Sequence, residues 1–216
     1  MQRNIRIFFE KTGRAKYISH LDMTRCWTRT FNRAGLPMWY TEGFNPHLYM
    51  TFALPLSLGF EGLCESFDAR LIADIPLDEV KERLNQVLPT GLQISRVADQ
   101  KMNAREIKWA DYELCLECEN PKSVHEKLTE FLNRDSIVVE KRTKKGVKDM
   151  ELNGLYTVLE SSFDETSVLL KLRLATGVET NVNPMLLLEN SPVYAEILQT
   201  SVRRTAVLTA DLNNFE

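Results

Sequence analysis

The chain lacks the features that mark membrane and secreted proteins. No stretch approaches the roughly 20 consecutive apolar residues that a membrane span requires, and polar residues follow Met1 instead of the apolar core of a signal peptide. Four cysteines among 216 residues are too few and too scattered for a disulfide framework. With 44% apolar and 26% charged residues, the composition is that of an ordinary globular protein. We therefore expect a cytoplasmic protein with no membrane partner.

Signatures of cofactor and metal enzymes are also missing. The sequence contains no GxxxxGK[ST], GxGxxG, HExxH or GxSxG motif. Its one CxxC, from Cys115 to Cys118, lies in an alternating stretch typical of a strand, where this spacing directs the two side chains to opposite faces. A zinc or iron–sulfur site needs more converging thiolates than this. The sequence therefore predicts no cofactor and no metal.

Positive charge is scarce overall but strongly concentrated. The formal net charge is −3, yet residues 1–33 hold eight basic and two acidic residues, a local net charge of +6. Residues 141–148, KRTKKGVK, add five basic residues and no acidic one. Such asymmetry suits a polyanionic partner on part of the surface, while the acidic remainder suppresses indiscriminate binding.

Hydrophobic periodicity predicts the order βαββαβ in the first half of the chain. Strands are expected near 5–9, 47–56, 64–74 and 91–99, with helices over 20–34 and 76–89. Ser19 is placed to cap the first helix, and Gly35 and Pro37 mark its end. This order is typical of the split βαβ, ferredoxin-like fold, an antiparallel sheet with both helices on one face.

The pattern restarts after a linker near residue 103. Strands are expected over 109–119, 136–145, 155–163, 167–175 and 202–208, with helices over 121–134 and 183–190. We therefore expect an α+β protein of two tandem ferredoxin-like domains, residues 1–102 and 103–216, the second being ferredoxin-like or a related α+β domain.

The first helix carries two stripes. Met23, Trp27, Phe31 and Ala34 follow helical spacing and should form the buried one. Arg25, Arg29 and Arg33 also step by four, which predicts a row of guanidinium groups along one edge of the packed helix.

Aromatic residues are concentrated in the segment that follows this helix. We expect Trp39, Tyr49 and Phe52 to face the core, and Phe44, in the turn EGFNPH, to be exposed. Rings beside arginines suit RNA, because bases stack on rings and guanidinium planes while cations contact the phosphates.

Histidines in the same region allow an alternative reading. Histidine is the side-chain type whose ordinary pKa lies nearest neutrality, so His20 and His47, with Tyr17 and the nearby Lys16 and Arg14, form a set that could cleave RNA without a metal. No spacing motif supports catalysis, so an enzyme is the less favoured interpretation.

Three segments carry a family resemblance: FEKTGRAKYISHLDMTR, RAGLPMWYTEGFNPH and FALPLSLG. They resemble the radical-SAM-linked domain family of unknown function, bacterial proteins encoded beside or fused to a radical S-adenosylmethionine (SAM) protein, often near a ribonuclease of the E/G type. The likeness is close over residues 3–98 and looser in KRTKKGVKDMEL and VRRTAVL. The chain departs from the family at His47-Leu48, where a proline followed by a basic residue is usual. Its first half also resembles, at the level of fold, ferredoxin-like repeat-associated RNA-binding proteins, some of which cleave RNA.

These observations lead to one favoured hypothesis and two alternatives. The chain is expected to be a non-catalytic module that binds tRNA or rRNA and works with a separate radical SAM RNA-modifying enzyme. The residues expected to contact RNA are Arg14, Lys16, Arg25, Arg29, Arg33, Phe44, His47, Lys144, Lys145, Arg203 and Arg204. The alternatives are a metal-independent endoribonuclease and a protein-docking adaptor for the radical SAM partner.

Overall fold

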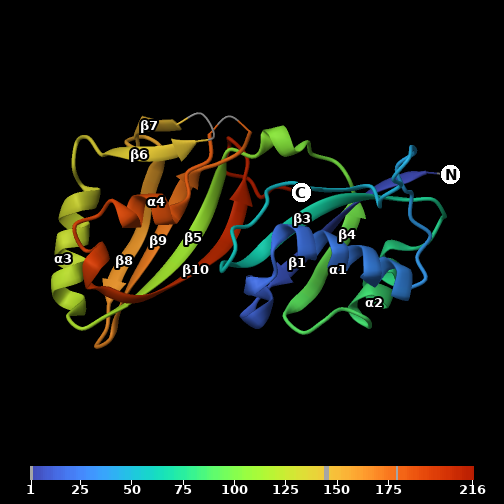
Figure 1. The fold of residues 1–216 in the computed structure, drawn as a ribbon, viewed down its shortest axis with the longest axis horizontal. Helices are drawn as coiled ribbons and strands as arrows, with labels where there is room; N and C mark the ends of the chain where they lie inside the picture. The colour runs from blue at the N-terminus through green and yellow to red at the C-terminus, as the bar shows by residue number, and fades with distance from the viewer. Residues whose placement is uncertain (1, 144–145, 179) are drawn as a thin grey trace. The chain divides into compact units, whose positions relative to one another are not determined.

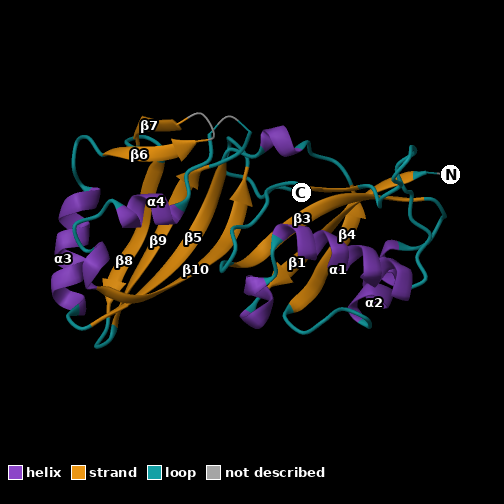
Figure 2. Ribbon diagram, viewed as in Figure 1, coloured by secondary structure: helices purple, strands orange, loops and turns teal. Residues whose placement is uncertain are grey.

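The computed structural model describes residues 2–143, 146–178 and 180–216, and divides the chain into two compact units (Figure 1). Unit 1 consists of Met1–Glu106 together with Phe215–Glu216, and unit 2 of Ile107–Asn214. Both combine helices with strands (Figure 2), and within each unit the described strand pairs run antiparallel. The predicted α+β class with a mostly antiparallel sheet is therefore confirmed.

Unit 1 has the predicted order βαββαβ. Its elements are β1 (Arg3–Lys11), the 3₁₀ turn η1 (Gly13–Tyr17), α1 (His20–Arg33), β2 (Met50–Phe52), β3 (Glu61–Leu71), α2 (Leu77–Asn85), β4 (Leu92–Asp99) and η2 (Ala104–Glu106). The strands lie in the order β4-β1-β3, and β2 pairs with the other side of β3. Both helices cover one face of this sheet (Figure 1), because their apolar residues belong to one core with those of β1, β3 and β4.

Aromatic packing fixes α1 on the sheet. Trp27 is fully buried, with its ring centroid 5.1 Å from that of Phe9 and 4.7 Å from that of Phe67. Met23 and Phe31 are buried beside it, and Ala34, the C-cap residue, packs against the same cluster. The predicted apolar stripe is therefore the buried face of the helix.

The predicted helix start is also confirmed. Ser19 Oγ accepts a hydrogen bond from the backbone N–H of Asp22 and donates one to its carboxylate. Gly35, at φ 63°, follows the C-cap in the left-handed conformation that glycine adopts at low cost.

Two elements of unit 1 are shorter than predicted. The strand expected over 47–56 is reduced to β2, because the residues before it form only isolated bridges, such as the one between Tyr40 and Leu48. The helix expected over 76–89 ends at Asn85. Pro89 disfavours the helical conformation at the residue before it, and the chain leaves the helix through a tighter turn in which Val87 N–H bonds the Leu84 carbonyl.

Unit 2 contains the predicted elements, but its last strand begins at Ile197 instead of near residue 202, and a strand over Gly146–Glu151 was not predicted. Its elements are β5 (Trp109–Cys118), α3 (Pro121–Leu132), β6 (Val138–Thr143), β7 (Gly146–Glu151), β8 (Tyr156–Phe163), β9 (Ser167–Ala175), α4 (Pro184–Glu189), η3 (Tyr194–Glu196) and β10 (Ile197–Leu208). Its main sheet has the order β10-β5-β9-β8. The strand expected over 136–145 does not join this sheet, because β6 pairs with β7 in a separate two-stranded sheet.

The CxxC motif lies on β5, as predicted. Alternate residues of β5 are buried, so Cys118 lies on the buried face and Cys115 on the other. Burial raises the pKa of the Cys118 thiol above its ordinary value, with the nearby Glu196 and Asp164 adding to the effect. In the described ranges no group of three histidine, cysteine or acidic side chains is placed to hold a metal ion.

A buried charge cluster covers the sheet face of unit 1 opposite the helices. The Arg6 side chain is fully buried and donates two hydrogen bonds to the Asp68 carboxylate, at 2.6 and 2.9 Å. Its other hydrogen bonds reach the carbonyl oxygens of Met102 and Glu216, and the Phe215 ring lies 4.2 Å from the guanidinium carbon. The last two residues of the chain are therefore part of unit 1.

No helix among the described residues is long and apolar enough to cross a membrane.

We predict that Asp68→Asn lowers the free energy of unfolding by about 3–5 kcal/mol, because the Arg6 charge is then buried without its counter-ion. Urea unfolding followed by tryptophan fluorescence measures this loss. The double variant Arg6→Met/Asp68→Leu should recover most of it. As a matched control, Asp99→Asn breaks the exposed pair of Arg3 and Asp99 and should cost less than about 1 kcal/mol. Equal losses for the two asparagine variants would contradict the proposed role of burial.

Candidate nucleic-acid interface

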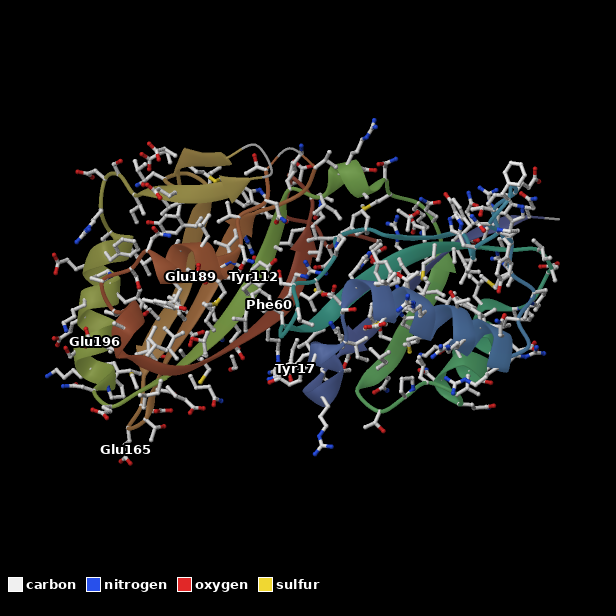
Figure 3. All side chains as sticks on the ribbon, in the orientation of Figure 1. Tyr17, Phe60, Tyr112, Glu165, Glu189 and Glu196 are labelled. Atoms are coloured by element: carbon white, nitrogen blue, oxygen red, sulfur yellow. The ribbon has the colours of Figure 1, made fainter. Side chains whose placement is uncertain are left out.

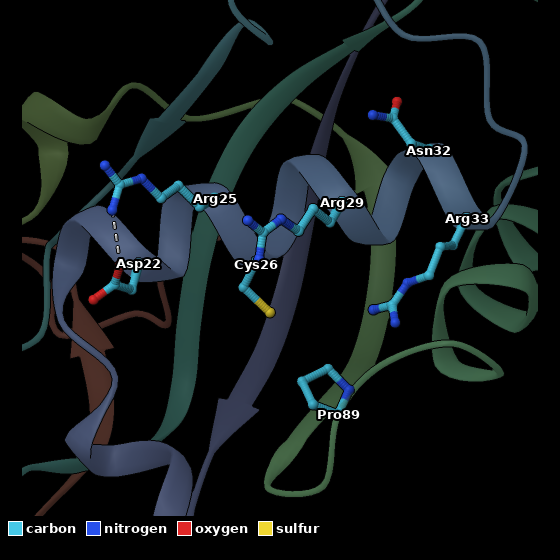
Figure 4. A pocket seen from close by; sticks show the side chains of 7 residues that line it. All are labelled: Asp22, Arg25, Cys26, Arg29, Asn32, Arg33 and Pro89. Atoms are coloured by element: carbon cyan, nitrogen blue, oxygen red, sulfur yellow. Dashed lines mark hydrogen bonds and ion pairs between the residues drawn. The ribbon is translucent and has the colours of Figure 1, made fainter.

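The arginines of α1 line a hollow of about 780 Å³ on the surface of unit 1 (Figure 4). Its walls are formed by Asp22, Arg25, Cys26, Arg29, Asn32, Arg33 and Pro89. Arg25 and Arg29 flank Trp27 at a distance of two residues, which is about 160° around a helix of 3.6 residues per turn. These two arginines therefore emerge on the side of α1 away from the core. Arg33, six residues and about 120° from Trp27, lies at the predicted edge, toward the loop of Pro89.

One end of the hollow is partly neutralised. Arg25 forms an ion pair with Asp22 at 3.1 Å, with both side chains largely exposed. The hydrogen bond from Ser19 and the ion pair with Arg25 hold the pKa of Asp22 below its ordinary value. The carboxylate is therefore ionised throughout the neutral range and repels anions at this end.

Arg29 and Arg33 form the positive end of the hollow. Both are exposed, and in the part of the chain that the structure describes neither is paired with a carboxylate. Figure 4 shows Arg33 and Cys26 directed toward the side of α1 on which Pro89 lies. Two guanidinium groups are thus available to an anion, each with several N–H donors.

The opposite wall belongs to the loop between α2 and β4, and η1 packs against the same loop. Thr12 N–H bonds the Gly91 carbonyl at 2.8 Å, and at φ 89° Gly91 fits closely against η1, because a Cβ there would lie 2.5 Å from the Thr12 carbonyl oxygen. Arg14 is exposed on η1, and the Lys16 ammonium lies 5.3 Å from the Tyr17 ring centroid. Tyr17, labelled in Figure 3, is 68% exposed. The basic η1 turn therefore borders the same loop as the hollow.

Several basic residues of the N-terminal run are not available to an anion. Arg6 is buried with Asp68, and Arg3 pairs with Asp99 at 2.6 Å. Lys11 is also buried, and its ammonium donates to the Ile18 carbonyl. The local net charge of +6 therefore overstates the positive surface, since burial and pairing consume part of it.

The aromatic segment forms a second candidate surface. Phe44 is fully exposed, as predicted, at the tip of the loop 41–47. Thr41 closes this loop by donating its N–H to the His47 carbonyl at 2.8 Å, and its hydroxyl oxygen accepts from the His47 N–H. The Tyr40 hydroxyl donates to Asn32 of α1 at 3.0 Å, which ties the base of the loop to the wall of the hollow.

Trp39 and Tyr49 do not join the core, contrary to the prediction, whereas Phe52 packs against it. Arg70 of β3 stacks on both rings, 4.7 Å from the Trp39 centroid and 4.8 Å from that of Tyr49. Sequence reasoning missed Arg70, because it lies in an alternating strand and is brought to the rings only by the pairing of the segment with β3. The sequence did hold one signal for Arg70: it lies two residues after Asp68 in an alternating strand, so both polar side chains lie on the same face of β3.

The residues of the ribonuclease alternative do not gather in one place. His20 begins α1, and its ring lies 4.9 Å from Phe52. His47 belongs to the loop anchored at Asn32, twelve residues further along the helix, and bonds Thr41 instead. No contact joins the two histidines or joins either one to Tyr17 among the interactions of the described residues.

The predicted contacts in the second half of the chain are only partly accessible. Arg203 of β10 is partly exposed and lies 3.8 Å from a carboxylate oxygen of Glu113. Arg204 is buried, at 2% exposure, because it occupies the covered face of the alternating strand β10. Arg204, which was expected to contact RNA, is therefore not accessible at the surface of unit 2. Lys144 and Lys145 lie outside the described residues.

Comparisons with known proteins assign the chain to a family. No protein with a curated description matches the chain. The chain is similar to the crystal structure of an unknown protein from Galdieria sulphuraria, with 12% sequence identity and a TM-score of 0.28. The alignment covers 82% of this chain and 84% of that protein. The family model described as "Uncharacterized protein conserved in bacteria (DUF2344)" matches residues 4–184, most of the chain. The protein therefore belongs to the DUF2344 family of conserved bacterial proteins.

Proposed function

We propose that unit 1 binds RNA through the hollow of α1, as a non-catalytic module for tRNA or rRNA. The observation that carries this proposal is the exposure of Arg29 and Arg33, which line one hollow without a paired carboxylate among the described residues. Successive arginines four residues apart are separated by about 6 Å along a helix, a spacing similar to that of neighbouring phosphates on one strand. Guanidinium groups suit phosphates because they donate bidentate, charge-assisted hydrogen bonds.

The acidic balance of the whole chain favours a localised site. With a net charge of −3, the protein has no general attraction for polyanions, so binding depends on the few unpaired cations. Arg14 and Lys16 on η1 extend the positive surface past the loop that forms the opposite wall.

We propose a radical SAM RNA-modifying enzyme as the partner of this module. The proposal rests on the resemblance of residues 9–25, 33–47 and 52–59 to the radical-SAM-linked family. In this arrangement, the module holds the RNA and the partner performs the chemistry. Tight association of the two proteins in the absence of RNA, with no RNA binding by either surface of unit 1, would favour the docking-adaptor alternative instead.

We also propose that both units are ferredoxin-like, the second with an insertion. The strand order β4-β1-β3-β2 of unit 1 corresponds to β10-β5-β9-β8 of unit 2 when the β6–β7 hairpin is set aside. In each unit the first strand is followed by a helix, and the last strand is preceded by one. This correspondence supports an internal duplication with a hairpin inserted after α3.

We predict that replacing Arg29 and Arg33 together by alanine weakens RNA binding and flattens its dependence on salt. Each lost phosphate contact should reduce the slope of log K against log [salt] by about 1, so the double variant should lose about 2. Fluorescence anisotropy with labelled tRNA and rRNA fragments over a salt series measures both quantities. Arg105→Ala, which removes an exposed arginine of unit 1 outside the hollow, is the matched control and should affect the slope less.

No binding by the wild-type protein at low salt, or a slope near zero, would overturn the proposal. Equal effects of the Arg105 variant and a single arginine variant of the hollow would show that the site is not localised.

We predict that Asp22→Asn strengthens RNA binding. The substitution removes the negative charge from the hollow and releases Arg25, while the N-cap hydrogen bond from the residue-22 N–H to Ser19 remains possible. The gain should be about two- to fivefold, the equivalent of one exposed ion pair. Asp99→Asn removes a carboxylate paired with arginine elsewhere on unit 1 and serves as control. Unchanged or weaker binding by the Asp22 variant alone would contradict the placement of phosphates in the hollow.

The same carboxylate gives a pH dependence with a definite sign. Because the pKa of Asp22 is lowered, the carboxylate stays ionised as the pH falls from neutral, and its repulsion of RNA is relieved only when the pH falls through that lowered pKa. Binding measured between neutral pH and the ordinary aspartate range should therefore not change because of Asp22.

The ribonuclease alternative makes a separate prediction. Labelled RNA should be cleaved in the presence of EDTA, and His47→Ala should abolish the cleavage.

A further inference from the structure

We infer that the loop 41–47, together with Trp39, Tyr49 and Arg70, is a binding site for an unpaired RNA base. This inference rests on the proposed function, because it identifies the class of RNA that the phosphate-binding hollow receives. It predicts a preference for single-stranded segments over duplex.

The backbone conformation of the loop holds Phe44 in solvent. Its ends are joined by the hydrogen bonds between Thr41 and His47, and Gly43 at φ 128° adopts a conformation that other residues rarely reach. The His47 ring nitrogen Nδ1 is held 2.9 Å from the Thr41 hydroxyl. Because burying apolar surface is favourable, a phenyl ring held in water on a closed loop gains free energy when a partner covers it.

The base of the loop is a cationic platform of rings. The Trp39 and Tyr49 rings lie edge to face with centroids 5.4 Å apart, and the Arg70 guanidinium stacks on both. Backbone hydrogen bonds hold these residues, since Trp39 N–H bonds the Arg70 carbonyl and Tyr49 N–H bonds the Trp39 carbonyl. Such a platform matches the faces of nucleobases, which stack on aromatic rings and on guanidinium planes.

Arg70 keeps hydrogen-bonding capacity and charge for a ligand. Its Nε donates to Asn4 at 2.8 Å and its Nη1 to Gln2 at 3.3 Å, both neutral side chains. Among the residues described, no carboxylate pairs with it, and most of its five N–H donors have no partner. Arg70 is therefore able to donate to the edge of a base that stacks on the platform rings.

The position of the loop favours RNA over a protein partner. The hydrogen bond from Tyr40 to Asn32 connects the base of the loop to the helix that carries Arg29 and Arg33. The platform rings lie with Arg70 on the sheet face opposite α1. An RNA strand whose phosphates lie along the hollow therefore has to pass around the loop for an unpaired base to reach the platform. A duplex cannot do this, because its bases are stacked within the helix.

The test compares a short unstructured RNA strand with a blunt duplex made from it and its complement, using the full chain. Phe44→Ala should weaken binding of the single strand about 5- to 100-fold, the equivalent of one lost stacking contact, and leave duplex binding unchanged. Its salt slope should stay that of the wild type, because no phosphate contact is lost. Tyr194→Ala, which removes an exposed aromatic ring from unit 2, is the matched control.

A second variant and a spectroscopic signal make the test independent of Phe44. Arg70→Lys keeps the charge but removes the planar stacking group, and should weaken single-strand binding only. The Trp109→Phe substitution leaves Trp27 and Trp39 as the only tryptophans of the sequence. Because Trp27 is buried in the core, a change of fluorescence on binding reports on Trp39, and we expect the fluorescence to fall when the single strand binds.

The outcomes separate this inference from the proposed function. Salt-dependent RNA binding with equal affinity for both forms, unchanged by Phe44→Ala, would overturn the base site and leave the phosphate hollow intact. Loss of radical SAM protein binding in the Phe44 variant, with RNA binding unchanged, would also overturn it and would assign the loop to protein docking. Absence of any RNA binding at low salt would overturn both proposals.

Discussion

The packing of Trp27 determines which side chains of α1 face solvent and can contact a ligand. Its indole ring is enclosed by Phe9, Phe31 and Phe67, and these contacts fix the rotation of α1 about its axis. Once one side of a helix is fixed against a sheet, the direction of every other side chain follows from 3.6 residues per turn. Arg25, Arg29 and Arg33 face solvent because Trp27 faces the core. The indole N–H has no hydrogen-bond partner among the described residues, so apolar packing must outweigh that cost.

The two faces of the unit 1 sheet differ in what they bury. The helix-covered face is apolar, whereas the opposite face buries Arg6 and satisfies it with Asp68, two backbone carbonyls and the Phe215 ring. A buried charge is tolerated only when its hydrogen bonds are satisfied, and here the last residues of the chain contribute. Farther along the same face, Arg70 performs a different role, because it stacks on two half-buried rings and, among the described residues, its hydrogen-bond partners are neutral.

Sequence patterns predicted elements with strong local signals and failed where pairing decided the result. The α1 start at Ser19, its buried stripe, the strand character of the CxxC segment and the exposure of Phe44 all follow from local spacing. The separate β6–β7 sheet was missed, because an alternating segment does not reveal which strand it will pair with. The length of β2 was overestimated for the same reason.

The amino-acid sequence by itself determined the α+β order, the amphipathic first helix and the concentration of basic residues, since periodicity and composition are local properties. Only the tertiary structure decided which of those cations remain available to an anion. Arg6, Lys11 and Arg204 look the same as Arg29 and Arg33 in the sequence, yet the first three are buried and the other two are exposed. Burial and pairing depend on residues far away in the chain, such as Asp68 and Glu216 for Arg6, and no local pattern encodes them.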